Sequence, residues 1–280
     1  MARIAVVTDS VACIPPDLVQ KYGIQVAPVQ ITWDRQTYRD GIDMTPEQFY
    51  ARLRTSKTLP TTSSGIQGEF LQIFEGLRGK VDGAVTIVLS GALGAAYTSA
   101  CNAREMVSDL PIEVIDTRTA MMAQGFVVLE AAKVAARGGS LEEVAQAARV
   151  TIPKTHIIWA METLEYLRRG GRVSLPQAVL ASWLKVKPIT AIRDGKVAPL
   201  ARARTKPRAV DKVLELIASE VSTTPLHAAV MHGDVPQEAE EFKQRVASRF
   251  QCAELLVSEI TPVIGTHTGP GTLGLAFYNE

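Results

Sequence analysis

The chain lacks the cysteine patterns, long apolar runs and charge excess that mark several protein classes. Its three cysteines, Cys13, Cys101 and Cys252, are far apart and form no Cys-x-x-Cys pair, so neither a metal site nor a disulfide framework is indicated. No run of about 18 apolar residues exists, so we expect no transmembrane segment. The first apolar run stops at Asp9, too early for a secretion signal, and we expect a cytoplasmic protein.

Length and charge give a second set of limits. The 280 residues predict about two domains, and the 46% hydrophobic and 21% charged residues are ordinary for a soluble globular protein. The net charge of +1 argues against a globally basic nucleic-acid binder. It hides a basic segment, however, because residues 165–208 hold 11 Lys/Arg and 2 Asp/Glu. Such a segment predicts a local partner or phosphate-facing surface.

Short apolar runs alternate with amphipathic stretches, which predicts an α/β protein. Residues 1–150 are interpreted as an N-terminal domain whose mostly parallel sheet is flanked by helices. Residues 151–280 form a second α/β domain, in which Asp194-Gly195 predicts an antiparallel hairpin. Among the expected elements are one strand over residues 24–32, a polar loop over 58–65, a helix over 92–106 and a glycine-rich loop over 264–271.

Small polar residues follow three predicted strands, at Thr8-Asp9-Ser10, Ser90-Gly91 and Asp116-Thr117. Ligands of open α/β sheets bind beyond the carboxyl ends of the strands, and a glycine-containing turn before a helix suits an anion. The alternative is that these residues only cap helices and permit tight turns.

Two histidines leave an enzyme open as the alternative function. His267, flanked by threonines, and His232, after a predicted strand, are candidates for a hydrolase or phosphotransferase that uses neighbouring hydroxyls. The sequence has no nucleophile elbow, P-loop or His-Glu-x-x-His motif. Gly269 to Gly274 matches G-x-G-x-x-G, but only six residues follow it, too few for a dinucleotide-binding unit.

Several motifs, in order, resemble the DegV family of bacterial fatty-acid-binding proteins, and the resemblance covers essentially the whole chain. They are Thr8-Asp9-Ser10, Tyr38-Arg-Asp-Gly41, Leu59-Pro-Thr-Thr-Ser63, Ser90 to Ala100, Val114-Ile-Asp-Thr117, Leu164 to Ser174, Lys187-Pro-Ile189 and Gly265 to Gly271.

The resemblance implies two α/β domains with a long-chain fatty acid in an apolar tunnel between them, and the loop over residues 264–271 returning to that site. It implies a lipid-binding carrier, with no cofactor and no catalytic residues of its own. A separate ATP-dependent kinase, similar to dihydroxyacetone kinases, would phosphorylate the bound acid for phospholipid synthesis.

The resemblance also implies which residues hold the carboxylate. Thr62 and His267 are the first candidates, with Ser63 and Thr268 as neighbours. The family serine of the next loop is Gly94 here. Either the Gly94 N–H and a water replace it, or the Ser90 hydroxyl reaches in, or the ligand binds differently in this protein. Hydroxyls and one imidazole would satisfy a buried carboxylate by hydrogen bonds.

The arginines of the basic segment are assigned to the kinase or the incoming phosphate. Arg172, Arg202 and Arg204 are the candidates, because arginine suits bidentate contact with phosphate. The alternative is a solvated basic face. Nucleic-acid binding is disfavoured, since Tyr166 and Trp183 are the only aromatic residues near these charges.

Overall fold

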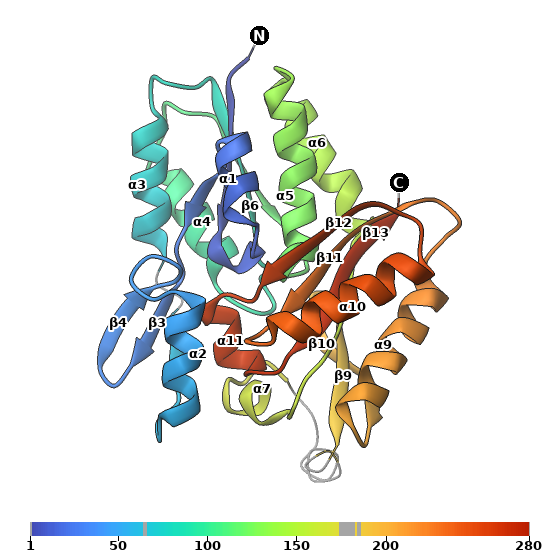
Figure 1. Ribbon diagram of the computed structural model, residues 1–280. Helices are drawn as coiled ribbons and strands as arrows, with labels where there is room; N and C mark the ends of the chain where they lie inside the picture. Colours follow the sequence, from blue (N-terminus) through green and yellow to red (C-terminus); the bar gives the residue numbers. More distant parts are fainter. Residues whose placement is uncertain (1, 64–65, 174–182, 184–185, 280) are drawn as a thin grey trace.

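The computed structural model describes residues 2–63, 66–173, 183 and 186–279, and its strands form three sheets (Figure 1). The first sheet is parallel and has the order β2-β1-β6-β7. Its strands are β1 (Ile4–Asp9), β2 (Gln25–Ala27), β6 (Gly83–Val88) and β7 (Ile112–Asp116). β6 is buried at every position, as expected for a parallel strand covered on both faces.

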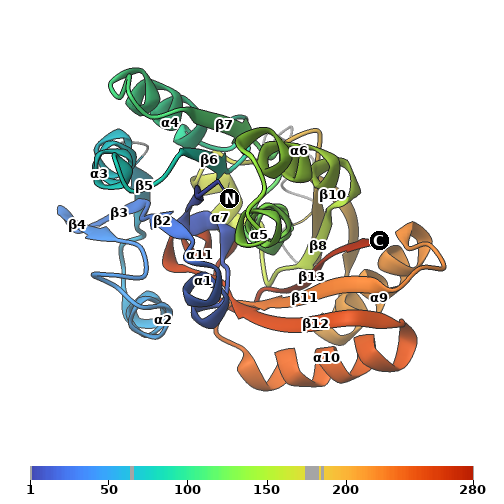
Figure 2. The same cartoon turned by 90° about the horizontal axis from the view of Figure 1, so that it is seen from above.

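Helices cover both faces of this parallel sheet (Figure 2). On one face lie α3 (Gln67–Leu77) and α4 (Ala96–Glu105), and on the other α5 (Met121–Ala136) and α6 (Leu141–Thr151). A capping box between Ser140 and Glu143 begins α6. The short elements η1 (Ser10–Ala12), α1 (Pro16–Tyr22) and η2 (Ile152–Lys154) complete this part of the chain.

The second sheet has six strands in the order β10-β9-β8-β13-β11-β12, and only β11 and β12 pair in parallel. Its strands are β8 (His156–Ala160), β9 (Lys187–Arg193), β10 (Lys196–Ala203), β11 (Leu226–His232), β12 (Cys252–Glu259) and β13 (Leu273–Asn279). The helices α9 (Lys206–Glu220) and α10 (Pro236–Arg249) pack on one face of it. The mixture of parallel and antiparallel sheets with helices confirms the predicted α/β class.

A third, small sheet has the order β4-β3-β5 and lies beside α2 (Pro46–Thr55). Its strands are β3 (Gln30–Trp33), β4 (Gln36–Arg39) and β5 (Thr61–Ser63). Trp33 and Phe49 pack edge to face at 5.5 Å, and the Arg52 guanidinium lies 4.5 Å from the Trp33 ring. These contacts pack β3 on α2, and β5, which carries Thr62, pairs with β3.

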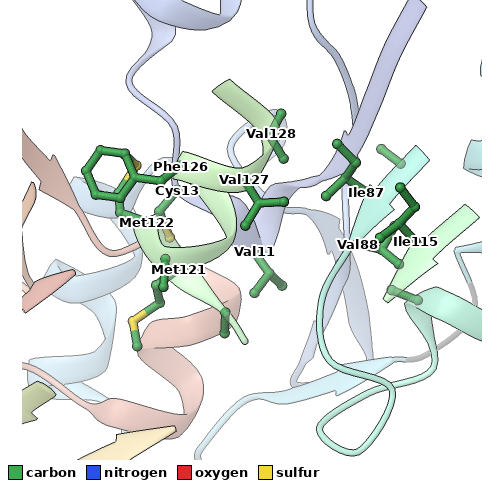
Figure 3. Close-up of a cluster of buried hydrophobic side chains, with 14 of the residues drawn as sticks. Val11, Cys13, Ile87, Val88, Ile115, Met121, Met122, Phe126, Val127 and Val128 are labelled. Atoms are coloured by element: carbon green, nitrogen blue, oxygen red, sulfur yellow. The ribbon is translucent and has the colours of Figure 1, made fainter. Parts of the chain in front are cut away.

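Helix α5 lies between the parallel sheet and the six-stranded sheet (Figure 2). Its sequence is apolar around nearly the whole circumference, and such a helix must be buried on all sides. Figure 3 shows Val127 and Val128 on the side of α5 that faces Ile87 of the parallel sheet. On the other side, Phe126 packs against Tyr278 of β13 at 5.2 Å. One continuous apolar core therefore joins the two sheets.

Several predicted elements were wrong in detail. The expected strand over residues 24–32 is two strands, β2 and β3, because the chain leaves the parallel sheet at Pro28 and joins the small sheet. The expected loop over 58–65 contains β5, and the helix expected from residue 92 begins at Ala96. The expected loop over 264–271 is largely helix α11 (Pro262–Thr268). Two strands were missed, β4 and the central strand β13.

Helix α11 is held at its N-terminal end by residues from distant parts of the chain. The N–H of Val263 donates to Oδ1 of Asp40 at 3.1 Å, and the Tyr50 hydroxyl donates to the Ile260 carbonyl at 3.2 Å. The Ser258 hydroxyl donates to the Cys13 carbonyl. Burial raises the pKa of Asp40 to about 7. The position of α11 thus depends on a buried carboxyl that is protonated below neutral pH.

Replacing this carboxyl should flatten the pH dependence of stability. The unfolded chain releases the Asp40 proton near pH 3.8, whereas the folded protein keeps it to about pH 7, so this group loses stability as the pH rises between these values. Over this window, titration of Asp40 should lower the free energy of unfolding of the unmodified protein by about 1.4 kcal/mol for each unit of pH. Asp40→Asn should lack this contribution, so its free energy of unfolding should depend less steeply on pH. Urea unfolding at pH 5, 6, 7 and 8 measures this difference.

Asp43 provides the matched control, because Arg39 lowers the pKa of this exposed carboxyl to about 2. Asp43→Asn should leave the slope between pH 5 and 7 unchanged. Equal slopes for Asp40→Asn and the unmodified protein would show that Asp40 is already ionised in the folded state.

A candidate ligand-binding pocket

A pocket lies where the parallel sheet, the small sheet and the six-stranded sheet meet. It holds about 780 Å³ of space between its walls, including the solvent-filled mouth. Most of its wall is apolar, and it includes Val11, Leu89, Met121, Trp159, Ile192 and Val197. These residues come from both halves of the chain, so the pocket exists only when the two sheets pack together.

Polar side chains gather at one end of this pocket. Thr62 on β5 and His267 on α11 lie with Oγ1 and Nε2 3.1 Å apart, although 205 residues separate them. Ser63 and Thr268 also line the pocket, and the Thr268 hydroxyl donates to the Ile264 carbonyl at 3.2 Å. Four of the residues predicted to hold a carboxylate are therefore brought together.

His267 is neutral at physiological pH. Burial, and to a smaller extent the charge of the nearby Arg172, lower the pKa of His267 to about 3. Within the described part of the chain, Nδ1 of His267 has no hydrogen-bond partner. A carboxylate on that nitrogen would be needed to complete a nucleophile–base–acid triad, so the Thr62–His267 pair has the composition of a hydrogen-bonding site rather than of a triad.

Arg172 is placed differently from the prediction, which assigned it to a partner-facing surface. After α7 (Glu165–Arg169), the Gly170-Gly171 turn directs it into the pocket wall. Nε of Arg172 donates to the Leu93 carbonyl at 3.3 Å, and one terminal nitrogen donates to the Gly170 carbonyl at 2.5 Å. Burial lowers the pKa of Arg172, and no described carboxylate pairs with it. The pocket therefore contains a half-buried cation to which no described residue supplies a counter-ion.

The neighbouring arginines show why the sequence could not single out Arg172. Arg168 and Arg169 both pair with Glu165 on the exposed face of α7. All three arginines stand in one motif, and only the turn at Gly170-Gly171 separates their environments. The only available signal was the Gly-Gly pair itself, which reverses the chain direction after the helix.

Ser90 and Gly94, the expected replacements for the family serine, differ in their relation to the pocket. The Ser90 hydroxyl donates to the Gly195 carbonyl at 2.8 Å and lies outside the pocket wall. Gly94 lines the pocket, but its N–H donates to the Ser90 carbonyl at 3.2 Å. Both groups are occupied by contacts within the protein.

The remaining candidate residues lie away from the pocket. Arg202 near the end of β10 and Arg204 just after it are exposed. His232 ends β11 outside the pocket wall, and burial lowers its pKa. The positive charge of the basic segment is also partly neutralised in the folded protein, because acidic residues from elsewhere in the chain form ion pairs with it. These pairs are Lys187–Glu162, Arg193–Glu220 and Lys206–Glu238.

Comparison with known proteins identifies the family of the chain. The family model for uncharacterised proteins of the DegV family matches residues 3–280. The chain belongs to the DegV family. A DegV domain-containing protein of Caldanaerobacter subterraneus subsp. tengcongensis is 35% identical over 278 residues, which cover 99% of each chain.

Two solved DegV structures resemble this one closely. A fatty-acid-binding DegV family protein from Thermus thermophilus superposes with a TM-score of 0.92 at 30% identity, covering 99% of this chain and 100% of the other. DegV of Bacillus subtilis, a fatty acid binding protein, gives a TM-score of 0.92 at 32% identity, covering both chains completely. Fatty acid binding is thus shown for these neighbours. No helix in the described residues is long and apolar enough to cross a membrane.

A methyl group at residue 170 should displace the His267 ring. A Cβ on Gly170 would lie 2.1 Å from Nδ1 of His267, while the φ of −72° at this residue suits alanine. In Gly170→Ala we therefore expect the imidazole to leave its buried position and its pKa to rise from about 3 towards the solvent value of about 6.5. NMR titration of the four histidines measures this shift.

Gly76→Ala is the control, since a Cβ at this position of α3 would meet no atom within 4 Å. It should leave the His267 titration unchanged. A pKa for His267 still near 3 in Gly170→Ala would contradict the ring position described above.

Proposed function

We propose that the protein binds one long-chain fatty acid in this pocket, with the carboxylate at the polar end and the acyl chain along the apolar wall. The observation that carries the proposal is Arg172, a half-buried guanidinium that lacks a described carboxylate partner beside an apolar pocket. A fatty acid supplies both the missing anion and the apolar surface. Fatty acid binding by the DegV structures from Thermus thermophilus and Bacillus subtilis supports it.

The head group would be held by one charge and two neutral groups. Arg172 supplies the positive charge, and Thr62 and neutral His267 supply hydrogen bonds, with Ser63 and Thr268 beside them. Hydrogen bonds to an ionised group contribute about 1.5–3 kcal/mol each. A carboxylate should therefore bind more tightly than a methyl ester, which carries no charge for Arg172.

The acyl chain would be held by burial alone. The part of the pocket wall formed by Leu89, Trp159 and Val197 is apolar. Each methylene removed from water contributes about 0.8 kcal/mol. The acyl chain would thus supply most of the binding free energy, and the polar end of the pocket would set the orientation of the ligand.

We further propose that this is a carrier which presents the carboxylate to a separate ATP-dependent kinase in the cytoplasm. The polar end of the pocket lies near the surface, because Thr62, Ser63 and Arg172 are themselves partly exposed. Arg202 and Arg204 would face the kinase or its phosphate. The free state of Cys13, Cys101 and Cys252 supports a reducing compartment.

Removing the Thr62 hydroxyl should weaken fatty acid binding while keeping the shape of the side chain. Native mass spectrometry of the purified protein should show one bound acyl chain. Calorimetry with added palmitate should then show an affinity about 10- to 100-fold lower for Thr62→Val, because one hydrogen bond to the carboxylate is lost. Methyl palmitate should bind equally to both proteins.

Thr61→Val is the matched control, since it makes the same change on the exposed side of β5. It should bind palmitate like the unmodified protein. The proposal fails if no acyl chain is found and no added long-chain acid binds. Turnover of acyl or phosphoryl substrates without a partner, lost in His267→Ala, would indicate an enzyme instead.

The kinase surface has its own test. Arg202→Ala with Arg204→Ala should lower the rate of acyl phosphate formation by an added ATP-dependent fatty acid kinase, while palmitate affinity stays unchanged. The physical reason is that both residues are exposed and lie outside the pocket wall. Equal losses of binding and phosphorylation would place these arginines in the ligand site.

A further inference from the structure

The hairpin formed by β9 and β10 extends beyond the strand that supports it. β9 pairs with β8 only through residues 189–191, whereas β9 and β10 pair with each other up to Arg193 and Lys196. Among the described residues, no other strand pairs with the tip from Ile192 to Val197. Its side-chain links to the rest of the six-stranded half are those of Arg193, which pairs with Glu220 of α9 and contacts His156 of β8. A segment without backbone pairing to a third strand opens more easily than the body of a sheet.

This tip forms part of the pocket wall. Ile192 and Val197 both line the cavity, opposite Leu89 and Met121 from the parallel sheet. Two contacts that the structure shows connect the tip to the loops of that sheet. The Ser90 hydroxyl donates to the Gly195 carbonyl at 2.8 Å in a buried position, and Arg118 lies 3.7 Å from Asp194.

The Ser90 contact is the stronger of the two. The Arg118 and Asp194 side chains are 61% and 96% exposed, so solvent screens their attraction almost completely. Gly195 is also suited to the close approach of Ser90. Its φ is +80°, and a Cβ there would lie 2.7 Å from Oγ of Ser90. Sequence and geometry both favour a tight contact at this point.

We propose that Ser90 is a positioning residue, whose hydrogen bond to Gly195 holds the hairpin tip as a movable wall of the acyl-chain pocket. Opening of this wall admits and releases the ligand. The inference rests on the proposed fatty acid binding, but the contact itself exists without ligand. Ser90 acts through the hairpin and not through the carboxylate, which explains why it lies outside the pocket wall.

Removal of the Ser90 hydroxyl should free the tip. In Ser90→Ala, a fluorescent long-chain fatty acid should be released about two- to tenfold faster than from the unmodified protein, the effect of one lost hydrogen bond. Amide hydrogen exchange of residues 192–197 in the ligand-free protein should rise by a similar factor. A release rate and an exchange rate equal to those of the unmodified protein would overturn the proposal.

Ser258→Ala is the matched control, because Ser258 also uses a buried hydroxyl to bond a distant carbonyl, that of Cys13. It should leave exchange at residues 192–197 unchanged. If hydrogen exchange at residues 192–197 became equally faster in Ser90→Ala and Ser258→Ala, the cause would be a general loss of stability, and the proposal would fail. If the unmodified protein binds no fatty acid, the proposed function fails, while the exchange experiment still decides whether Ser90 holds the tip.

A covalent link can replace the hydrogen bond. A Cβ on Gly195 would lie 3.7 Å from Cβ of Ala92, close to the spacing of about 3.8 Å in disulfides. In Ser90→Ala/Ala92→Cys/Gly195→Cys, the oxidised form should release the fluorescent acid more slowly than the unmodified protein, and reduction should restore the fast rate of Ser90→Ala. Equal rates in the oxidised and reduced forms would show that the ligand leaves by another route.

Discussion

The fold depends on the burial of helix α5. This helix is apolar around nearly its whole circumference, so it is stable in water only when both the parallel sheet and the six-stranded sheet cover it. The pocket lies where this cover ends, at the first residue of the helix. Met121 there has a φ of +54° and lines the cavity. A left-handed residue costs about 1–3 kcal/mol and needs a surrounding structure that holds it in place, which the two sheets provide.

The polar end of the pocket is governed by the cost of burying charge. His267 avoids this cost by staying neutral, and Thr62 satisfies its Nε2. Arg172 cannot lose its proton at physiological pH, so it keeps its charge and satisfies two of its N–H groups with carbonyls. A carbonyl offers only a partial negative charge. An anion in the pocket would therefore improve the environment of Arg172 more than that of any other residue named here.

Local patterns in the sequence predict many of the elements, and Asp194-Gly195 correctly predicts the antiparallel hairpin of β9 and β10. They fail where distant segments decide the structure. α11 was predicted as a loop because its glycine and threonines are poor helix formers, yet Asp40, 223 residues away in sequence, accepts its first free N–H. β13 was missed because the sequence does not show that Gly274 makes room for Trp159 across the sheet.

The residues of the candidate site also fall into those that the sequence could identify and those that it could not. The motifs named Thr62 and His267, and the structure brings them within hydrogen-bonding distance. They could not place Ser90 or Arg172, because a hydroxyl or guanidinium shows its partner only after the chain has folded. The basic segment makes the same point for charge. Glu162, Glu220 and Glu238 all lie outside residues 165–208. In the folded protein they nevertheless form ion pairs with Lys187, Arg193 and Lys206 of this segment. Once these pairs are made, Arg172 is the cation that the protein itself leaves without a described counter-ion at the pocket, and a ligand carboxylate fits that place.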